Sequence, residues 1–430
     1  MKKMVCRFLA MVFSCFKPNP LSQQDTISVN ESISDQGTGR SSNLMCLLAD
    51  EVLIEIFLRL PPHPSCILRA SIVCKHWRHL ITSTLFLRCF HEFHQMPPLL
   101  GFFTNSTRIP HFLPYGDTPN RVIAAAFSLP DPYWQVLCCR HSHVILVNSI
   151  WTRILVWDPM TGEKRFVSMP NLTIEPGSQV AVFCRAGHND HSCPFFIVWV
   201  YTIGITAYAR EYSSERGTWN LFKISSVPFG SKVDSRPSVL VGNVLYWLLK
   251  PNHILAFDCG TRKLHCIECP PETNDICRRN VHVMKVEDGG LGLIAVMQFG
   301  LLLWARETNA EGAPSWVLRK VIDLDAYLPV AVAALPSTDN HTTRRPAVMI
   351  LGIIEDDDVV FLWMISGVFA VQLNSMHFKK IFESDVSVAI FPYKSFYIAG
   401  ASGGRDAGGN DAGGEEQEET SRPTRSICVC

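Results

Sequence analysis

The stretch that decides the architecture of this chain runs from Leu48 to Phe90. It begins L-A-D-E-V-L-I-E-I-F-L-R-L-P-P and contains V-C-K-H-W-R-H-L-I near its end. The first part predicts a helix with Asp50 as its N-cap, and Pro61 and Pro62 end that helix. One face of the helix is apolar and carries Val52, Leu53, Ile56, Phe57 and Leu60.

Two more helices are expected over about 65–73 and 75–82, and a fourth helical stretch over about 84–93 leads toward the next part of the chain. A helical unit of this size buries too little surface to work alone. The stretch is therefore interpreted as a docking module, which leaves most of the chain free for another task.

The bulk properties describe a folded chain with more than one domain. It has 430 residues, of which 47% are hydrophobic and 18% charged, and its formal net charge is zero. A zero net charge gives no reason to expect nucleic acid or an anionic membrane as a partner. No apolar run reaches the roughly 18 uninterrupted residues of a membrane helix.

The sixteen cysteines are scattered, and many lie in apolar runs, which is typical of free thiols in a reducing compartment. The expected location is therefore cytoplasmic and/or nuclear. Lys2 and Lys3 precede an apolar stretch, Val5–Phe16, as in a signal peptide, but Arg7 interrupts this stretch and no small-residue cleavage site follows.

Composition divides the chain into five parts. Residues 1–43 are expected to be a disordered N-terminal segment, 44–94 the helical module, 95–120 a linker, 121–398 a β domain, and 399–430 a disordered, acidic, Gly-rich tail.

The β domain carries a degenerate repeat in which an apolar strand ends in an aromatic residue and a short turn leads to a second strand. The pattern is clear at Ile154–Val167 and Ile254–Ile267. Successive strand ends are mostly about 45 to 55 residues apart, which is the period of four-stranded propeller blades, and about six blades would fit. The last gap is longer and holds an insertion or a missed unit. These strand ends lie near Trp157, Tyr212, Phe257, Trp304 and Val371.

The Leu48–Phe90 stretch resembles the F-box. The β domain resembles, more diffusely, the propeller-type domain of plant F-box proteins, through G-N-V-L-Y-W at Gly242–Trp247 and through the order of the two parts. The fold expected from this resemblance is α+β and multidomain, with a small three-helix module before an all-β, propeller-like repeat domain. The residues that match the F-box are Leu48, Asp50, Glu51, Leu53, Ile56, Leu60, Pro61, Arg69, Val73, Cys74, Lys75, Trp77, Leu80 and Ile81.

The resemblance implies a substrate-recognition subunit of a Skp-cullin-F-box ubiquitin ligase. The F-box would dock on a Skp-type adaptor and through it on a cullin, and the β domain would bind a protein target. Such a subunit is not an enzyme and needs no cofactor or metal; it raises the concentration of the target near a ubiquitin-charged enzyme. By match to the motif, the adaptor-binding residues are Leu48, Leu53, Ile56, Leu60, Pro61, Val73 and Trp77.

Some of these apolar residues must instead form the small core of the module. Core and interface roles are both open for Trp77. For Phe57, Ile72 and Leu80 the same two roles are equally open. Ala49 stands where the family usually has proline, which removes a preorganised helix start and implies weaker adaptor binding at most.

Two other readings of the whole chain remain open. In one, the β domain is an interaction scaffold and the F-box has degenerated and lost its function, with Ala49 as a symptom. In the other, the chain is a propeller enzyme such as a secreted hydrolase. Co-purification with the adaptor distinguishes a ligase subunit, which binds it, from a scaffold with a degenerate F-box, which does not.

Five short motifs suggest other chemistry, but the spacing or the context of each one argues against it. Cys184, His188, His191 and Cys193 suit zinc but match no common finger, and Cys266 with Cys269 and Cys277 is weaker. Glu355–Asp358 lacks the ligand spacing of a calcium loop and is better interpreted as a hairpin turn. G-A-S-G-G at 400–404 has no helix after it, and Cys428–Cys430 is not a C-a-a-X terminus.

Overall fold

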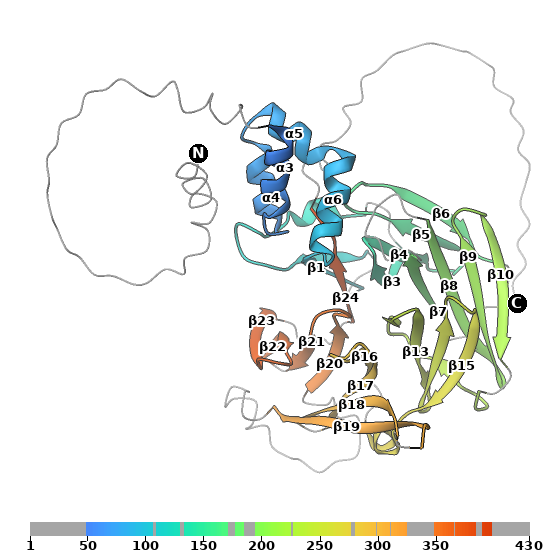
Figure 1. The fold of residues 1–430 in the computed structure, drawn as a ribbon. Helices are drawn as coiled ribbons and strands as arrows, with labels where there is room; N and C mark the ends of the chain where they lie inside the picture. The colour runs from blue at the N-terminus through green and yellow to red at the C-terminus, as the bar shows by residue number, and fades with distance from the viewer. Residues whose placement is uncertain are drawn as a thin grey trace, which may run out of the picture.

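The computed structural model describes residues 49–105, 109–129, 133–170, 177–184, 194–224, 227–276, 280–297, 299–309, 311–324, 348–364, 366–383 and 389–397. The segments 1–43 and 399–430 that were predicted to be disordered lie outside these residues, as does Leu48. A small group of helices lies against a ring of six sheets, next to the strands β1 and β24 (Figure 1).

Four helices form the module: α3 (Asp50–Leu58), α4 (Pro64–Ser71), α5 (Lys75–Thr82) and α6 (Thr84–His94). The predicted N-cap is corrected by one residue, because Ala49 occupies the cap position of α3 and makes no side-chain hydrogen bond. Asp50 lies inside the first turn, where a carboxylate is favoured by the helix dipole, and its Oδ1 contacts His76 Nε2 at 2.8 Å.

The fourth helix belongs to the module instead of only leading away from it. Phe86 and Phe90 of α6 pack in the same core as Phe57 and Trp77. The Phe57 and Trp77 rings meet edge to face with centroids 4.9 Å apart, and Phe57 meets Phe86 in the same way at 6.3 Å. The module therefore has one aromatic core to which α3, α5 and α6 all contribute.

Five antiparallel sheets follow in chain order, and each is one blade. The first has β3 (Trp134–Arg140), β4 (His143–Asn148), β5 (Arg153–Trp157) and β6 (Lys164–Ser168). The second has β7 (Gln179–Cys184), β8 (Phe195–Ile203), β9 (Thr206–Ser213) and β10 (Thr218–Ile224). The third has β11 (Lys232–Val233), β12 (Val239–Val241), β13 (Val244–Lys250), β14 (His253–Asp258) and β15 (Lys263–Glu268).

The fourth blade has β16 (Val281–Lys285), β17 (Leu291–Met297), β18 (Gly300–Thr308) and β19 (Pro314–Asp323), and the fifth has β20 (Val348–Ile353), β21 (Val359–Met364), β22 (Gly367–Gln372) and β23 (His377–Phe382). Two short 3-10 helices, η3 (Ala124–Phe127) and η4 (Pro271–Asp275), lie between strands. Apolar clusters fill the spaces between neighbouring blades, so each blade covers its faces with the next one.

A sixth sheet closes the ring from both ends of the β domain. It has the order β2 (His111–Pro114), β1 (Leu99–Thr104) and β24 (Ile390–Lys394), with Phe103 opposite Phe391. The segment 95–120, expected to be a linker, thus supplies two strands of a blade. This pairing joins strands almost 290 residues apart in sequence, which a local pattern does not reveal.

The period read from the sequence marks the same strand in five successive blades. Trp157, Tyr212, Phe257, Trp304 and Val371 all lie on the third strand of their sheets, β5, β9, β14, β18 and β22. The six-bladed propeller expected from this spacing is the architecture observed. The long gap between Trp304 and Val371 separates two consecutive blades, and the described residues in it form no further sheet. The sixth blade is the closing one, whose strands come from opposite ends of the domain.

The repeated turns are built by aspartate side chains. Asp158 Oδ1 accepts a hydrogen bond from the backbone N–H of Met160 at 2.9 Å, and Asp258 Oδ1 accepts one from Gly260 at 2.8 Å. Outer-strand tryptophans then tie neighbouring blades together. Trp219 Nε1 donates to the carbonyl oxygen of Ser168 at 3.0 Å, and Trp316 Nε1 donates to that of Glu268 at 2.8 Å.

Within the described residues, every helix is too short or too polar to traverse a lipid bilayer. The cysteines in those residues are free thiols, including the buried Cys138, Cys184, Cys259 and Cys269.

Candidate functional site

The residues predicted to bind an adaptor separate into three groups. Leu53, Leu60 and Trp77 are buried in the aromatic core of the module, so they support a surface and do not form one. Ile56 and Pro61 are half-buried, and Val73 is 51% exposed. Leu48 lies outside the described residues.

The most exposed apolar side chain in this region is one that the motif did not assign to the adaptor. Ile72 is 67% exposed because α4 ends at Ser71, which leaves Ile72 and Val73 on the turn before α5. The Asp50–His76 contact brings the start of α3 to the start of α5, and Val52 in the first turn of α3 is exposed as well. Val52, Leu68, Ile72 and Val73 are called the apolar face below.

A second exposed apolar pair lies on α6. Leu85 is 57% exposed and Phe93 is 53% exposed. These side chains match Ile72 and Val73 in exposure but belong to the helix that leads to the propeller, so they provide a natural comparison for the apolar face.

The helical module and the propeller share a packed junction. Phe396, just after β24, is buried within the helical core; its ring stacks on His91 with centroids 4.4 Å apart and meets Phe90 edge to face at 5.8 Å. Ser65 Oγ also donates to Asn120 Oδ1 at 2.5 Å. The last described residues of the chain thus complete the core of the first domain.

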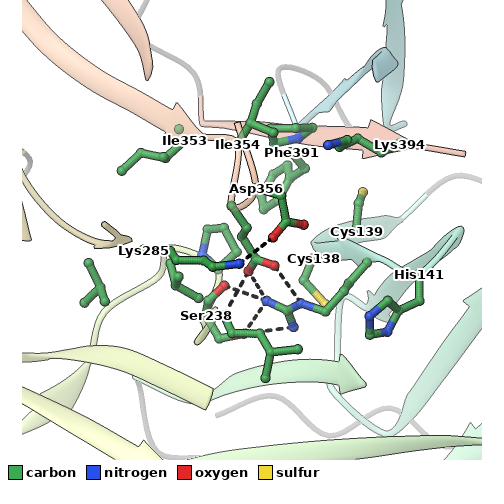
Figure 2. Close-up of a pocket in the computed structure, with 18 of the residues that line it drawn as sticks. Cys138, Cys139, His141, Ser238, Lys285, Ile353, Ile354, Asp356, Phe391 and Lys394 are labelled. Carbon is green, nitrogen blue, oxygen red and sulfur yellow. Dashed lines mark hydrogen bonds and ion pairs between the residues drawn. The ribbon is translucent and has the colours of Figure 1, made fainter. Parts of the chain in front are cut away.

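The propeller contains a cavity of about 360 Å³ that is lined by residues of several blades (Figure 2). Its walls are the ends of inner strands and the turns that follow them. The apolar part of the lining includes Val283, Ile353, Ile354 and Phe391, and Met96 and Pro97, which join α6 to β1, also contribute. The cavity is therefore adjacent to the helical module.

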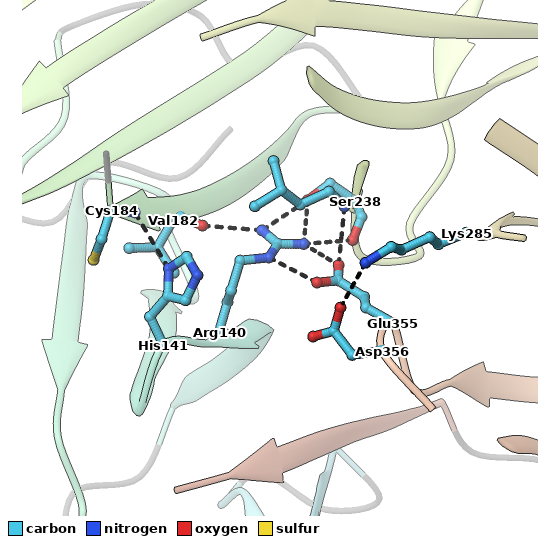
Figure 3. Close-up of polar contacts among 9 residues, drawn as sticks. Arg140, His141, Val182, Cys184, Ser238, Lys285, Glu355 and Asp356 are labelled. Atoms are coloured by element: carbon cyan, nitrogen blue, oxygen red, sulfur yellow. Dashed lines mark hydrogen bonds and ion pairs between the residues drawn. The ribbon is translucent and has the colours of Figure 1, made fainter. Parts of the chain in front are cut away.

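A buried arginine in the lining of this cavity links four blades (Figure 3). Arg140, at the end of β3, donates to the carbonyl oxygens of Val182 and Ser238, both at 2.9 Å. Its Nε donates to Glu355 Oε2 at 3.0 Å, and Nη2 contacts Glu355 Oε1. Burial alone would lower the pKa of Arg140, but the charge and hydrogen bonds of Glu355 outweigh it and raise that pKa.

The acidic turn Glu355–Asp358 forms ion pairs with residues of several blades. Besides Glu355 with Arg140, Asp356 pairs with Lys285 at 3.1 Å and Asp357 with Lys394 at 3.0 Å. The backbone N–H of Ile354 donates to Val359 across the turn at 3.1 Å, as in the predicted hairpin. Cations from other strands thus pair with three of the four carboxylates of this turn, and Asp358 accepts a hydrogen bond from the Asn374 side chain.

The described residues contain no cluster of three or more His, Cys, Asp or Glu side chains that could hold a metal ion. Of the zinc-like set, only Cys184 is described; His188, His191 and Cys193 lie outside the described residues, as does Cys277 of the weaker set. Burial raises the pKa of Cys138 to about 11 and that of Cys269 to about 12, so these thiols are protonated at neutral pH.

His141 lies beside the cavity and is held neutral. Burial, together with the positive charge of the neighbouring Arg140, lowers its pKa to about 4. Its Nδ1 accepts a hydrogen bond from the backbone N–H of Cys184 at 3.2 Å, which matches the neutral ring. The cavity is thus lined by paired charges, a neutral histidine and apolar side chains.

Two family models match the chain. The F-box domain matches residues 45–89, and the model described as "F-box protein AT5G49610-like, beta-propeller" matches residues 135–395. No curated protein matches the chain.

Solved structures with similarity include the WD40 domain of SCAP from fission yeast and a chain of the mitotic checkpoint complex. Both are 12% identical, with TM-scores of 0.33 and 0.31, and cover 61% and 58% of this chain. The chain spans 56% and 63% of the length of those two chains.

Proposed function

The chain belongs to the family of F-box proteins with an AT5G49610-like β-propeller, and on that premise we propose that it is the substrate-recognition subunit of a Skp-cullin-F-box ubiquitin ligase. The F-box docks on a Skp-type adaptor, the adaptor connects it to a cullin, and the propeller binds the protein target. The proposal includes the plant type of the family and a cytoplasmic and/or nuclear location.

The observation that carries the proposal is the apolar face of the helical module. Ile72 and Val73 are adjacent, more than half exposed, and lie within the part of the chain that matches the F-box. A small module gains nothing in stability from apolar side chains in water, and such a patch is typical of a protein-binding surface. The buried Leu53, Leu60 and Trp77 hold the helices that present it.

In this proposal the subunit performs no covalent chemistry. It holds a target at high local concentration beside a ubiquitin-charged enzyme, and the fixed junction at Phe396 sets the position of the propeller relative to the adaptor. The 360 Å³ cavity is our candidate for target contact, because its volume and mixed lining suit a small apolar group with polar neighbours.

The test is co-purification of the full chain with a recombinant Skp-type adaptor. The variant Ile72→Asp/Val73→Asp places two charges on the apolar face without touching the core, and we expect it to lose adaptor binding. The matched control is Leu85→Asp/Phe93→Asp, which adds the same charges at similar exposure on α6 and should bind as the wild type does.

The outcomes separate the ligase subunit from an interaction scaffold with a degenerate F-box. Both variants must first show the thermal unfolding midpoint of the wild type. Absence of adaptor binding by the wild-type chain at micromolar concentration would favour the scaffold. Equal binding by both variants would mean that the adaptor uses another surface.

A further inference from the structure

The segment from α4 to α5 carries only basic charge. Residues 64–82 contain no Asp or Glu, whereas Arg69, Lys75 and Arg78 are all exposed. On α5, Lys75, Arg78 and His79 follow the i, i+3, i+4 spacing and lie on one face, opposite the buried Trp77. These three α5 residues are called the basic face below.

The basic face has little compensation from the folded part of the chain. Among the residues that the structure describes, neither Lys75 nor Arg78 pairs with a carboxylate. Arg78 Nε donates to the backbone carbonyl oxygen of Ser71 at 3.2 Å, which orients the guanidinium but leaves its charge unneutralised. Asp50 contacts His76 of the same helix, but Lys75 and Arg78 keep their charges unpaired, and such a surface attracts a negatively charged partner.

The chain itself contains a segment of opposite charge. Residues 406–419 read D-A-G-G-N-D-A-G-G-E-E-Q-E-E, with six acidic residues and no basic one. Four of the acids are concentrated in Glu415–Glu419. This segment has no role in the proposed adaptor or target binding.

The tail begins at the helical module. Phe396 is buried in the helical core, so the chain after Tyr397 starts beside α6. Positions 398–415 can span up to about 60 Å when extended, whereas α6, the longest helix of the module, is about 16 Å long. This length of chain is sufficient for the acidic residues to reach α5.

We infer that the acidic segment 406–419 docks on the basic face of α5 within the same chain. The basic face follows directly on Ile72 and Val73, so a docked tail also covers part of the apolar face. A tethered segment acts at an effective concentration in the millimolar range, so weak ion pairs are sufficient. The docking stands on its own; its consequence, competition with the adaptor, rests on the proposed function.

The docking is tested with a fluorescently labelled peptide of residues 406–419. The protein is the full chain in which Glu415, Glu416, Glu418 and Glu419 are replaced by Gln, so that its own tail does not compete. We expect the peptide to bind at low ionic strength and to lose affinity as salt is added. Adding Lys75→Glu/Arg78→Glu to this chain should weaken binding about ten-fold or more.

The matched control is Lys223→Glu/Lys232→Glu, which reverses two exposed charges on the propeller and should leave peptide binding unchanged. Each variant is first shown to keep the circular dichroism spectrum and unfolding midpoint of its parent. An absence of binding at low salt, or equal binding to the Lys75→Glu/Arg78→Glu chain and its parent, overturns the inference.

Competition between the tail and the adaptor is tested by measuring adaptor affinity. The Gln-substituted chain should bind a Skp-type adaptor about three-fold or more tightly than the wild type at low ionic strength, and the difference should vanish in high salt. If the peptide docks but neither chain binds the adaptor, the docking holds and the proposed function fails. If both chains bind the adaptor equally, the competition is contradicted while the proposed function holds.

Discussion

At the scale of single residues, the propeller depends on a few side chains that contact several blades at once. Arg140 is the clearest case, because its guanidinium reaches β7, the segment before β12 and the β20–β21 turn. Nothing in the local pattern around Arg140 reveals this role, since its partners are 42 to 215 positions away. The turn residue Glu355 was likewise predicted only as part of a hairpin.

Glu355→Gln should destabilise the whole propeller. The substitution leaves Arg140 buried without its counter-charge, which should lower the free energy of unfolding. The expected loss is about 2–4 kcal/mol, slightly less than for a fully buried pair, because the Glu355 side chain is partly exposed. Denaturant unfolding measures this change. Glu383→Gln removes a carboxylate from the exposed pair with Lys380 and should leave the midpoint unchanged; an equal loss in both variants would contradict the role of the buried pair.

Acid should weaken the third blade through Asp234. Burial would raise the pKa of Asp234, but the hydrogen bond and charge of Arg236, with Lys250 at 3.2 Å, lower it from 3.8 to about 2. The carboxylate therefore contributes about 2 kcal/mol above pH 4, which is lost as the pH falls from about 4 to about 2. In denaturant unfolding between about pH 4 and about pH 2, the Asp234→Asn variant should lose less unfolding free energy than the wild type. If both proteins lose the same amount, Asp234 is not the group that causes the acid sensitivity.

At the scale of elements, the sequence pattern predicted those strands, turns and helices that are formed by residues close together in the chain. The third strands of five blades, the Asp158 and Asp258 turns and the positions of α5 and α6 all follow from sequence within about fifteen residues. The closing blade could not be predicted in this way, because β1 and β2 find their partner in β24 at the other end of the domain. The sequence left Ile72 open between core and interface; it is exposed because α4 ends at Ser71, whereas the expected second helix ran to Val73.

The closing blade requires a residue without a side chain in β1. A Cβ atom on Gly101 would lie 2.4 Å from the carbonyl oxygen of Leu113 and from the ring of Phe112. Gly101→Ala should therefore separate β1 from β2 and lower the free energy of unfolding by about 1–3 kcal/mol. Gly300→Ala is the control, since its nearest neighbour would be 3.4 Å away; similar unfolding midpoints for the two variants would contradict this account of β1.

At the scale of the whole molecule, the junction makes one body of two domains that differ in fold. Phe396 joins the C-terminal end of the propeller to the core of the helices, and the neighbouring Ser395 donates its backbone N–H to the Pro98 carbonyl oxygen at 3.3 Å. A fixed arrangement of this kind holds a target at a constant distance from whatever binds the helices. Its aromatic contacts link residues about 300 positions apart, which sequence patterns do not show.

Phe396→Ala should uncouple the two domains. Removing a buried phenylalanine costs about 3–5 kcal/mol, and here the loss falls on the contact between domains. Scanning calorimetry should then show two unfolding transitions where the wild type shows one. Phe229→Ala, at a side chain that is 84% exposed, should keep the wild-type profile; a single transition in the Phe396→Ala variant would contradict the coupling.

The most direct test of the central claim is amide hydrogen exchange of the full chain with and without a Skp-type adaptor. The account predicts slower exchange in the presence of the adaptor at the first turn of α3 and across Ile72–Lys75, with unchanged exchange in the outer strands of the propeller. Protection confined to the propeller, or no protection anywhere at saturating adaptor, would contradict the claim that the apolar face is the docking surface of this F-box.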